Sequence, residues 1–128
     1  MNIKIFSSTQ DYFIPKVEKL CCQEPTKAYI VSTLSKPPDL SAQSITVAFA
    51  EAKSRQEFIK YQNIGDFLLF IETFYPEYLK NASPEYFIAV AQVSYLACFK
   101  MTHRKISIYE ELADRFKEIV KKLKIGAR

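Results

Sequence analysis

The sequence predicts an all-α protein, a compact single-domain helical bundle of about five to six helices with two central apolar helices. Three observations support this prediction. The chain has 128 residues, of which 48% are hydrophobic and 14% aromatic, so it can bury a substantial core and is not disordered. It contains only 2 glycines, too few for the turns of a barrel or a sandwich. Its apolar residues recur at helical spacing between proline-containing breaks.

The N-terminal segment has the weakest helical pattern. We treat residues 1–128 as one domain, in which residues 1–25 either pack against the remainder or form a loosely packed N-terminal arm. Residues 1–6 alternate in polarity as a short strand or an extended segment would. A helix is predicted over residues 15–23, because Pro15 suits the first turn of a helix, where no amide donor is required.

Two further helices are predicted before the middle of the chain. Pro25 ends the preceding helix, and Thr26 is expected to cap the next one, which runs to about residue 35. Two prolines within residues 35–39 prevent helix there and mark a loop that is too short to link domains. A helix over residues 41–52 follows. The expected apolar positions are Ala28, Ile30, Val31 and Leu34 in the first helix and Ile45, Ala48, Phe49 and Ala52 in the second.

Residues 55–74 are predicted to form the first central helix. Ser54 and Glu57 match a capping box, in which the serine and glutamate side chains accept hydrogen bonds from amides at the start of the helix. Pro76 ends the helix. Its apolar residues form two adjoining stripes, so neighbours should cover it on most sides. The stripes are Tyr61, Ile64, Leu68, Ile71 and Tyr75, and Phe67, Phe70 and Phe74.

Residues 84–102 are predicted to form the second central helix, after a short helical turn over residues 76–81. Ser83, Pro84 and Glu85 supply its cap, a first-turn proline and a first-turn acid. Apolar residues lie all round this helix, and small side chains allow a neighbouring helix to approach closely. The small residues are Ala89, Ala91, Ser94, Ala97 and Cys98.

The last helix is predicted over residues 108–124, after a second capping box formed by Ser107 and Glu110. A single apolar stripe makes this helix amphipathic, so it should cover one side of the core. The stripe is Leu112, Phe116, Ile119, Val120 and Leu123. Favourable pairs of an acid four residues before a base occur at Glu111–Arg115 and Glu118–Lys122.

The net charge of +4 lies entirely in the C-terminal segment, because residues 100–128 carry nine basic and four acidic residues. Such a segment could attract nucleic acid or anionic lipid. A solvated helix whose terminal lysines complement the helix dipole explains the same charges. The basic side chains also spread around the helix, so we consider nucleic-acid binding less favoured. The residues it would use are Arg115, Lys117, Lys121, Lys122 and Lys124.

The cysteines favour a reducing, cytoplasmic compartment, because three of them cannot form a disulfide framework. Cys21 and Cys22 are adjacent and cannot bridge each other without strain. No long apolar segment typical of a signal peptide follows the N-terminal residues. The longest apolar stretch, residues 86–99, is shorter than the roughly 20 residues of a membrane-spanning helix, so we expect no membrane association.

No motif points to catalysis, a metal or a cofactor, and we expect a non-enzymatic protein that uses none of them. The single histidine, His103, has basic neighbours and is expected at the surface. The cysteine spacing does not match a zinc site, and two glycines cannot form a phosphate-binding loop.

Gly65 and Asp66 form the most informative pair. Glycine inside a helix costs about 1 kcal/mol relative to alanine, so its presence suggests a close helix crossing or a bend. Asp66 lies among apolar residues, and a buried carboxylate would require donors such as Gln92, Arg55 or a tyrosine hydroxyl. We favour a structural role for both residues, in which a buried polar contact sets the helix register. The alternative is a ligand pocket near Asp66, Gln92 and Tyr95, between the two central helices.

Two segments resemble an uncharacterised family of small all-helical bacterial proteins that has no assigned activity. Residues 65–76, GDFLLFIETFYP, resemble its "GD…LF…FFP" segment, and residues 86–95, YFIAVAQVSY, resemble its "YYI…G…AY" segment. The sequence departs from the family at Glu72, Thr73 and Ala91, where the family has small residues or glycine. The resemblance implies an all-helical fold and a bacterial cytoplasmic setting, and it supplies no catalytic residue.

The sequence favours a protein that acts by binding a protein partner or a second copy of itself. The chain has 10 Phe and 8 Tyr, more than the core of so small a protein is expected to cover, and exposed aromatic residues favour interfaces. The alternative function is binding of a small molecule in the pocket near Asp66, Gln92 and Tyr95.

Overall fold

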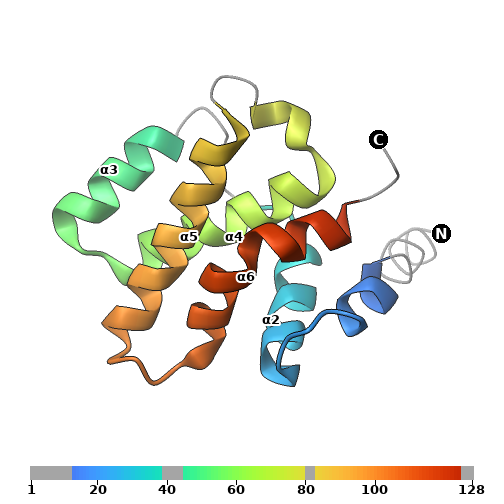
Figure 1. The fold of residues 1–128 in the computed structure, drawn as a ribbon. Helices are drawn as coiled ribbons and strands as arrows, with labels where there is room; N and C mark the ends of the chain where they lie inside the picture. Colours follow the sequence, from blue (N-terminus) through green and yellow to red (C-terminus); the bar gives the residue numbers. More distant parts are fainter. Residues whose placement is uncertain (1–12, 39–44, 80–82, 125–128) are drawn as a thin grey trace.

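The computed structural model describes residues 13–38, 45–79 and 83–124 of the chain. These residues form a helical bundle (Figure 1). The elements are α2 (Glu24–Leu34), α3 (Ile45–Arg55), α4 (Phe58–Phe74), the 3-10 turn η2 (Pro76–Leu79), α5 (Pro84–Met101) and α6 (Ser107–Leu123), with a further helical segment at residues 13–18. The described residues contain no strand, so the all-α prediction is confirmed. The strand or extended segment predicted at residues 1–6 lies outside the described residues.

The bundle is organised around three helices. The most extensive contacts join α4 to α5 and α5 to α6, while α3 packs against α4 and α2 lies against both α4 and α6. In Figure 1, α5 and α6 lie in front of α4, with α3 beside α5 and α2 below. This arrangement places residues of α2, α4 and α5 around one point in the middle of the molecule, where the polar side chains discussed below meet.

The core follows the predicted apolar stripes. All five residues of the α6 stripe are buried, as predicted. In α4, the second predicted stripe has one buried residue, Phe67, and two half-buried ones, Phe70 and Phe74. The first stripe is buried up to Ile71, whereas Tyr75 at the helix end is 45% exposed. Each buried Leu, Ile or Phe side chain contributes about 1.5–3 kcal/mol through removal from water, so this contiguous cluster accounts for the cohesion of the bundle.

The N-terminal part differs from prediction in its boundaries. Residues 13–18 are helical and residues 19–22 form turns, in place of the helix predicted over 15–23. Phe13, Val17 and Leu20 are buried in the core. Pro25 lies in the first turn of α2, where proline fits, and does not end the preceding helix. The cap predicted at Thr26 is therefore wrong.

The capping box predicted at Ser54 and Glu57 is also wrong. Helix α3 continues through Ser54, and the fully buried Ala52 in its last turns packs into the core. The chain leaves the helix at Gln56, whose φ of 53° is left-handed and whose amide donates a hydrogen bond to the Ala52 carbonyl at 2.7 Å. Helix α4 begins after Glu57 without a side-chain cap. The left-handed Gln56 thus ends α3, and the boundary between the two helices lies further along the chain than the sequence pattern predicted.

Of the two other predicted caps, the one at the start of α5 is confirmed and the one at the start of α6 is wrong. The hydroxyl of Ser83 accepts a hydrogen bond from the Tyr86 amide at 3.3 Å, so the cap of α5 is confirmed. Helix α6 begins at Ser107 itself and has no side-chain cap. The Ser107 hydroxyl donates instead to Oε1 of Gln23 at 3.3 Å, so this serine joins α6 to the start of α2.

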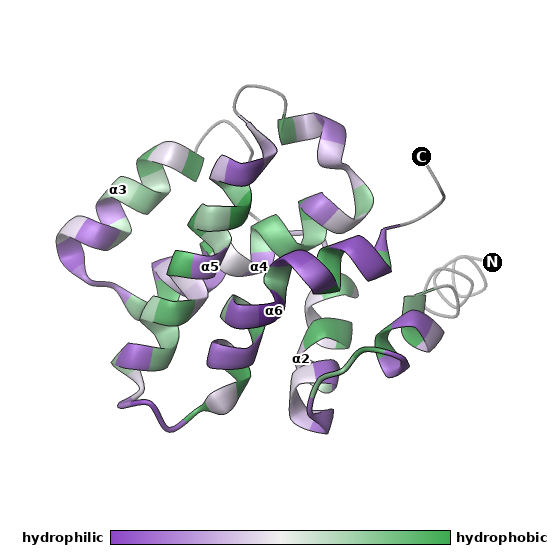
Figure 2. Cartoon of the chain, viewed as in Figure 1, coloured by the Kyte–Doolittle hydropathy of each residue, from purple (hydrophilic) through white to green (hydrophobic). Residues whose placement is uncertain are grey.

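Helix α5 is not covered on all sides. Its residues Tyr86, Ala89, Val93, Leu96 and Ala97 form an apolar face that the described elements leave partly open, and we call this set the α5 face. Tyr86 is 37% and Val93 47% exposed. Figure 2 shows the contrast between α5, coloured as apolar over most of its length, and α6, which alternates between polar and apolar colours. The two central helices therefore differ, since α4 is the more completely enclosed.

No helix in the described part of the chain is both long enough and apolar enough to span a bilayer.

Candidate functional site

The polar centre of the molecule is the carboxylate of Asp66, a half-buried residue in the middle of α4. Its Oδ1 atom accepts hydrogen bonds from the hydroxyl of Tyr29 at 2.8 Å and from the hydroxyl of Tyr95 at 2.7 Å. Tyr29 belongs to α2 and Tyr95 to α5. One carboxylate oxygen therefore ties three helices together.

Gly65 makes this arrangement possible. A Cβ atom at this position would lie 2.7 Å from both Cε1 and Cζ of Tyr95, closer than such atoms approach in proteins. The glycine thus lets the buried Tyr95 ring lie directly on the backbone of α4. The ring fills the space between the two helices and brings its hydroxyl to Asp66 on the next residue of the chain.

Three tyrosine rings surround the carboxylate and form what we call the tyrosine cluster, Tyr29, Tyr95 and Tyr109. Their ring centroids lie 5.8–6.4 Å apart, and the Tyr29 ring makes edge contacts with the other two. The amide of Gln62 donates a hydrogen bond to the Tyr109 hydroxyl at 2.8 Å. Such aromatic pairs contribute about 0.5–1.5 kcal/mol beyond burial, so the cluster adds rigidity to the site.

The surroundings shift the proton affinity of these groups upward. Burial raises the pKa of the Asp66 carboxyl above its ordinary value, and the hydrogen bonds from Tyr95 and Tyr29 act in the opposite direction. Burial, and next the charge of Asp66, raises the pKa of Tyr29 and Tyr95 far above the ordinary value. Both hydroxyls therefore stay protonated, and able to donate to Asp66, well beyond neutral pH.

The three residues of the predicted ligand pocket do not come together. Tyr95 contacts Asp66 directly and is fully buried. The Gln92 amide donates instead to the backbone carbonyl of Ala113 at 3.2 Å and so joins α5 to α6. Among the proposed donors for Asp66, tyrosine hydroxyls supply the contacts, whereas Arg55 is exposed at the end of α3.

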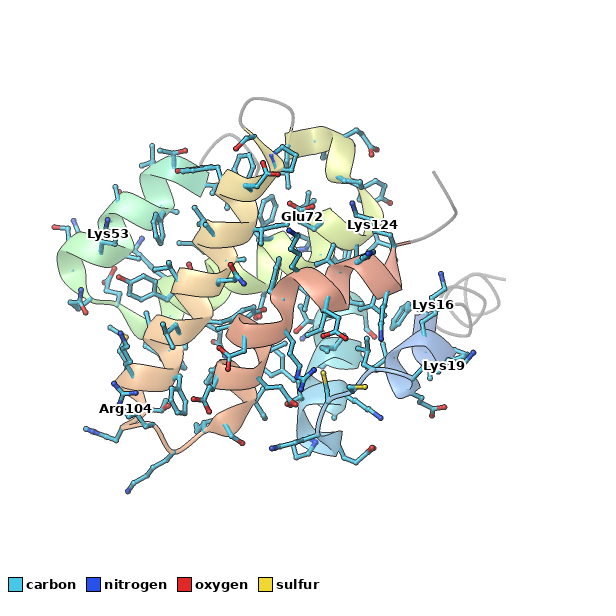
Figure 3. The ribbon with its side chains drawn as sticks, in the orientation of Figure 1. Lys16, Lys19, Lys53, Glu72, Arg104 and Lys124 are labelled. Atoms are coloured by element: carbon cyan, nitrogen blue, oxygen red, sulfur yellow. The ribbon has the colours of Figure 1, made fainter. Side chains whose placement is uncertain are left out.

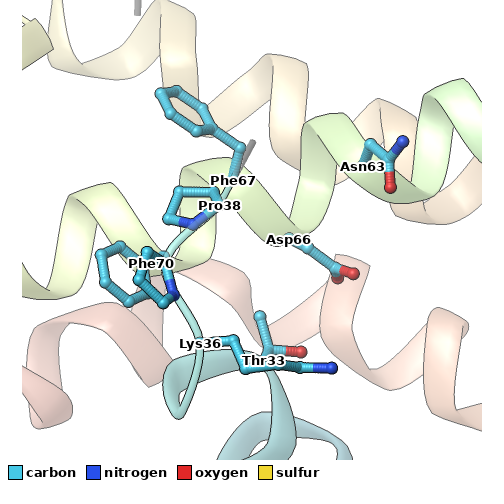
Figure 4. Close-up of a pocket in the computed structure, with 8 residues that line it drawn as sticks. Thr33, Lys36, Pro38, Asn63, Asp66, Phe67 and Phe70 are labelled. Carbon is cyan, nitrogen blue, oxygen red and sulfur yellow. The ribbon is translucent and has the colours of Figure 1, made fainter. Parts of the chain in front are cut away.

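A pocket does adjoin Asp66, on the side of α4 that faces α2 and the loop after it (Figure 4). Its volume is about 370 Å³. It is lined by Thr33, Lys36, Pro37, Pro38, Asn63, Asp66, Phe67 and Phe70. Apart from Asp66, the sequence interpretation assigned none of these residues to a site. The proline pair was identified only as a loop, and nothing in its local pattern shows that the loop faces Asp66.

Glu72 is a second buried acid that the sequence interpretation did not single out as a site. Its side chain lies near the end of α4 and is only 5% exposed. Burial raises the pKa of the Glu72 carboxyl, while the positive charge of Lys124 acts to lower it. Figure 3 shows the two residues next to each other at the C-terminal end of α6.

Replacing Glu72 with glutamine is expected to stabilise the protein at neutral pH and to flatten its pH dependence. Because the folded-state pKa of Glu72 lies above the unfolded-state value, the folded state binds the extra proton between the two values. Stability therefore falls as pH rises through that interval, which starts at about pH 4.3. Urea denaturation of both proteins from pH 4 to pH 7 measures the effect. The exposed Glu77 gives the control variant Glu77→Gln, and an equal pH slope in wild type and Glu72→Gln would contradict the expectation.

The other reactive residue types are dispersed in the described part of the chain. Burial raises the pKa of the Cys98 thiol to about 12 and that of Cys22 above its ordinary value. His103 is exposed, in a turn where its φ is 56°. No group of three or more His, Cys, Asp or Glu side chains that could hold a metal ion occurs within the residues described.

The basic residues of α6 are partly engaged with acids of the same helix. Arg115 lies 3.9 Å from Glu111 and 3.4 Å from Glu118, and Lys122 lies 3.5 Å from Glu118. Glu111 also accepts hydrogen bonds from the Gln23 amide and the Thr26 hydroxyl. The contacts of Glu111 with Gln23 and Thr26 attach α2 to α6. The ion pairs Glu111–Arg115 and Glu118–Lys122 are those predicted from the sequence.

Comparisons with protein-family models, with curated proteins and with solved structures found no match to this chain. The resemblance of residues 65–76 and 86–95 to a family of small bacterial proteins therefore stays a prediction.

Proposed function

We propose that the protein acts by self-association, as a symmetric dimer in which the α5 faces of two copies pack antiparallel. The observation that carries this proposal is the pattern of the exposed side of α5. This side of the helix is apolar along its length. An acid, Glu85, lies at its N-terminal end and a base, Lys100, at its C-terminal end.

The apolar part has the character of an interface. No charged residue occurs from position 86 to position 99, and Val93, at the middle of the face, is 47% exposed. A hollow of about 230 Å³ adjoins the face and could receive side chains of a partner. It is lined by Gln56, Val93, Leu96, Ala97, Lys100 and Met101. Contiguous exposed apolar surface of this kind favours an association site over simple solvent exposure.

The two end charges favour a second copy of this chain as the partner. Glu85 and Lys100 are both exposed, lie about four helical turns apart and form no ion pair with the described residues. In an antiparallel pair of α5 helices centred near Val93, Glu85 of each copy would lie opposite Lys100 of the partner subunit. The symmetry makes this contact twice, as expected for an isologous interface.

We expect Val93→Glu to produce a folded monomer, because it places two like charges at the centre of the interface, which costs several kcal/mol in binding. Lys100→Glu or Glu85→Lys alone should weaken the dimer about tenfold through two opposed like-charge pairs. The double variant E85K/K100E should restore association, because both pairs are re-formed with exchanged signs. Sedimentation equilibrium over a range of protein concentrations measures each dissociation constant.

Lys105→Glu is the matched control, since Lys105 is exposed but lies beyond the end of α5. It should leave the dimer unchanged. A wild-type chain that stays monomeric at all accessible concentrations would overturn the proposal, and so would a double variant that associates no better than the single ones.

A further inference from the structure

We propose that the pocket beside Asp66 binds a small zwitterion with an apolar part, namely a free α-amino acid with a large apolar side chain. This goes beyond the dimer, because the pocket lies between α4 and the segment that follows α2, whereas the α5 face belongs to another helix. The inference rests on how polar and apolar groups are divided in the pocket.

Figure 4 shows this division. The rings of Phe67 and Phe70 and the Pro38 ring lie on one side, while the polar ends of Asn63, Asp66, Thr33 and Lys36 lie on the other. Phe67 is buried in the core cluster and the half-buried Phe70 packs against it, whereas Pro38 belongs to the loop after α2. A ligand that fills both sides must itself be amphipathic.

Asp66 provides a prepared site for an ammonium group. Both tyrosine hydroxyls donate to Oδ1, and within the described residues no hydrogen bond to Oδ2 occurs. The tyrosines hold the carboxylate in one orientation, so little ordering is required when a ligand binds. The exposed side chain of Asn63, one turn earlier on α4, offers an amide oxygen as a second acceptor on the same side.

Lys36 provides the opposite charge. Its ammonium group forms no ion pair with an acid of the described chain, and Figure 4 shows it ending beside the Thr33 side chain. A carboxylate placed there would accept from the lysine and from the threonine hydroxyl, and charge-assisted hydrogen bonds of this kind are the strong ones. A ligand with one charge only would leave either Asp66 or Lys36 without a partner on the polar side of the pocket.

The size of the pocket fits this class of ligand. Its volume of about 370 Å³ lies at the lower end of the range of about 300–1,000 Å³ found for small-molecule sites. The apolar side is bounded by two phenylalanine rings and a proline, surfaces suited to an aromatic or branched aliphatic side chain. Phenylalanine is therefore the probe chosen for the test.

The test titrates the full chain with L-phenylalanine, phenylalanine amide, which lacks the carboxylate, and N-acetylphenylalanine, which lacks the ammonium group. Chemical shifts of backbone amides in NMR spectra report both the affinity and the location. We expect saturable shifts at pocket residues with L-phenylalanine. Each analogue should bind at least about tenfold more weakly than L-phenylalanine, because each loses a charge-assisted contact.

Two variants assign the charges. Lys36→Met should weaken L-phenylalanine about tenfold and leave phenylalanine amide unchanged, because the amide has no carboxylate for the lysine. Asp66→Asn should weaken L-phenylalanine and leave N-acetylphenylalanine unchanged, and the asparagine carbonyl can still accept from both tyrosines. Lys53→Met, at an exposed lysine on α3, is the matched control and should change nothing.

Three outcomes would overturn the inference. They are the absence of saturable shifts at pocket residues, analogues that bind as tightly as L-phenylalanine, and equal effects of Lys36→Met and Lys53→Met. Because Lys36 is exposed, its variant tests the inference even if Asp66→Asn fails to fold.

Discussion

Replacing Tyr95 with alanine is expected to lower the free energy of unfolding by about 3–5 kcal/mol, the range found for removal of a buried aromatic side chain. Tyr95 is fully buried, and its ring occupies the space that Gly65 leaves open on α4. Removing the ring opens a cavity between the two central helices and also leaves Asp66 with one donor. Urea denaturation monitored by circular dichroism measures the loss.

Tyr95→Phe separates the hydroxyl from the ring. It keeps the packing and removes only the hydrogen bond to Asp66, so we expect a smaller loss of about 1.5–3 kcal/mol, typical of a bond to a charged group. Tyr78→Ala is the control, because Tyr78 is 61% exposed and should change stability by no more than about 0.5 kcal/mol. If Tyr95→Phe proved as stable as wild type, the Asp66 contact would contribute nothing to the fold.

Gly65→Ala is expected to destabilise the protein, against the direction that helix propensity predicts. Alanine in place of a helical glycine gains about 1 kcal/mol from propensity alone. Here the added methyl group would lie 2.7 Å from the Tyr95 ring, which is buried and bonded to Asp66 and so cannot move freely. Overpacking of this kind costs about 1–3 kcal/mol, and displacement of the ring would weaken the hydrogen bond as well.

The double variant Gly65→Ala with Tyr95→Leu tests the cause. If the clash is with the Tyr95 ring, the alanine should cost less in the Tyr95→Leu background than in wild type, a coupling that a double-mutant cycle measures. The pair Asn63→Gly and Asn63→Ala, at an exposed position of the same helix, reports the glycine-to-alanine propensity difference without a clash. A stabilised Gly65→Ala variant would show that the ring yields easily.

The sequence pattern predicted the helices better than their ends. The apolar stripe of α6 was identified in full, because burial of one face imposes a spacing that is visible along the chain. The starts of α2 and α4 were predicted wrongly from Thr26 and Ser54. Residues that can cap a helix also occur within one: Thr26 is buried inside α2, and Ser54 lies in the last turn of α3.

The candidate site could be predicted only in part. Gly65 and Asp66 were identified because a glycine and an acid are each unfavourable inside an apolar helix unless something compensates. The compensation comes from Tyr29, 37 positions earlier in the chain, and Tyr95, 29 positions later. Pairings at such distances depend on how helices are placed in space, which local periodicity does not encode. Lys36 in the pocket was missed for the same reason.

The tyrosine cluster has a consequence for the behaviour of the protein in alkaline solution. An ordinary tyrosine releases its proton at about pH 10, whereas burial holds the pKa of Tyr29 and Tyr95 far above this value in the folded chain. Unfolding therefore releases protons above about pH 10, and raising the pH further shifts the equilibrium toward the unfolded chain. Since the chain contains no tryptophan, the ultraviolet absorbance of the phenolate would follow this transition without an overlapping indole band.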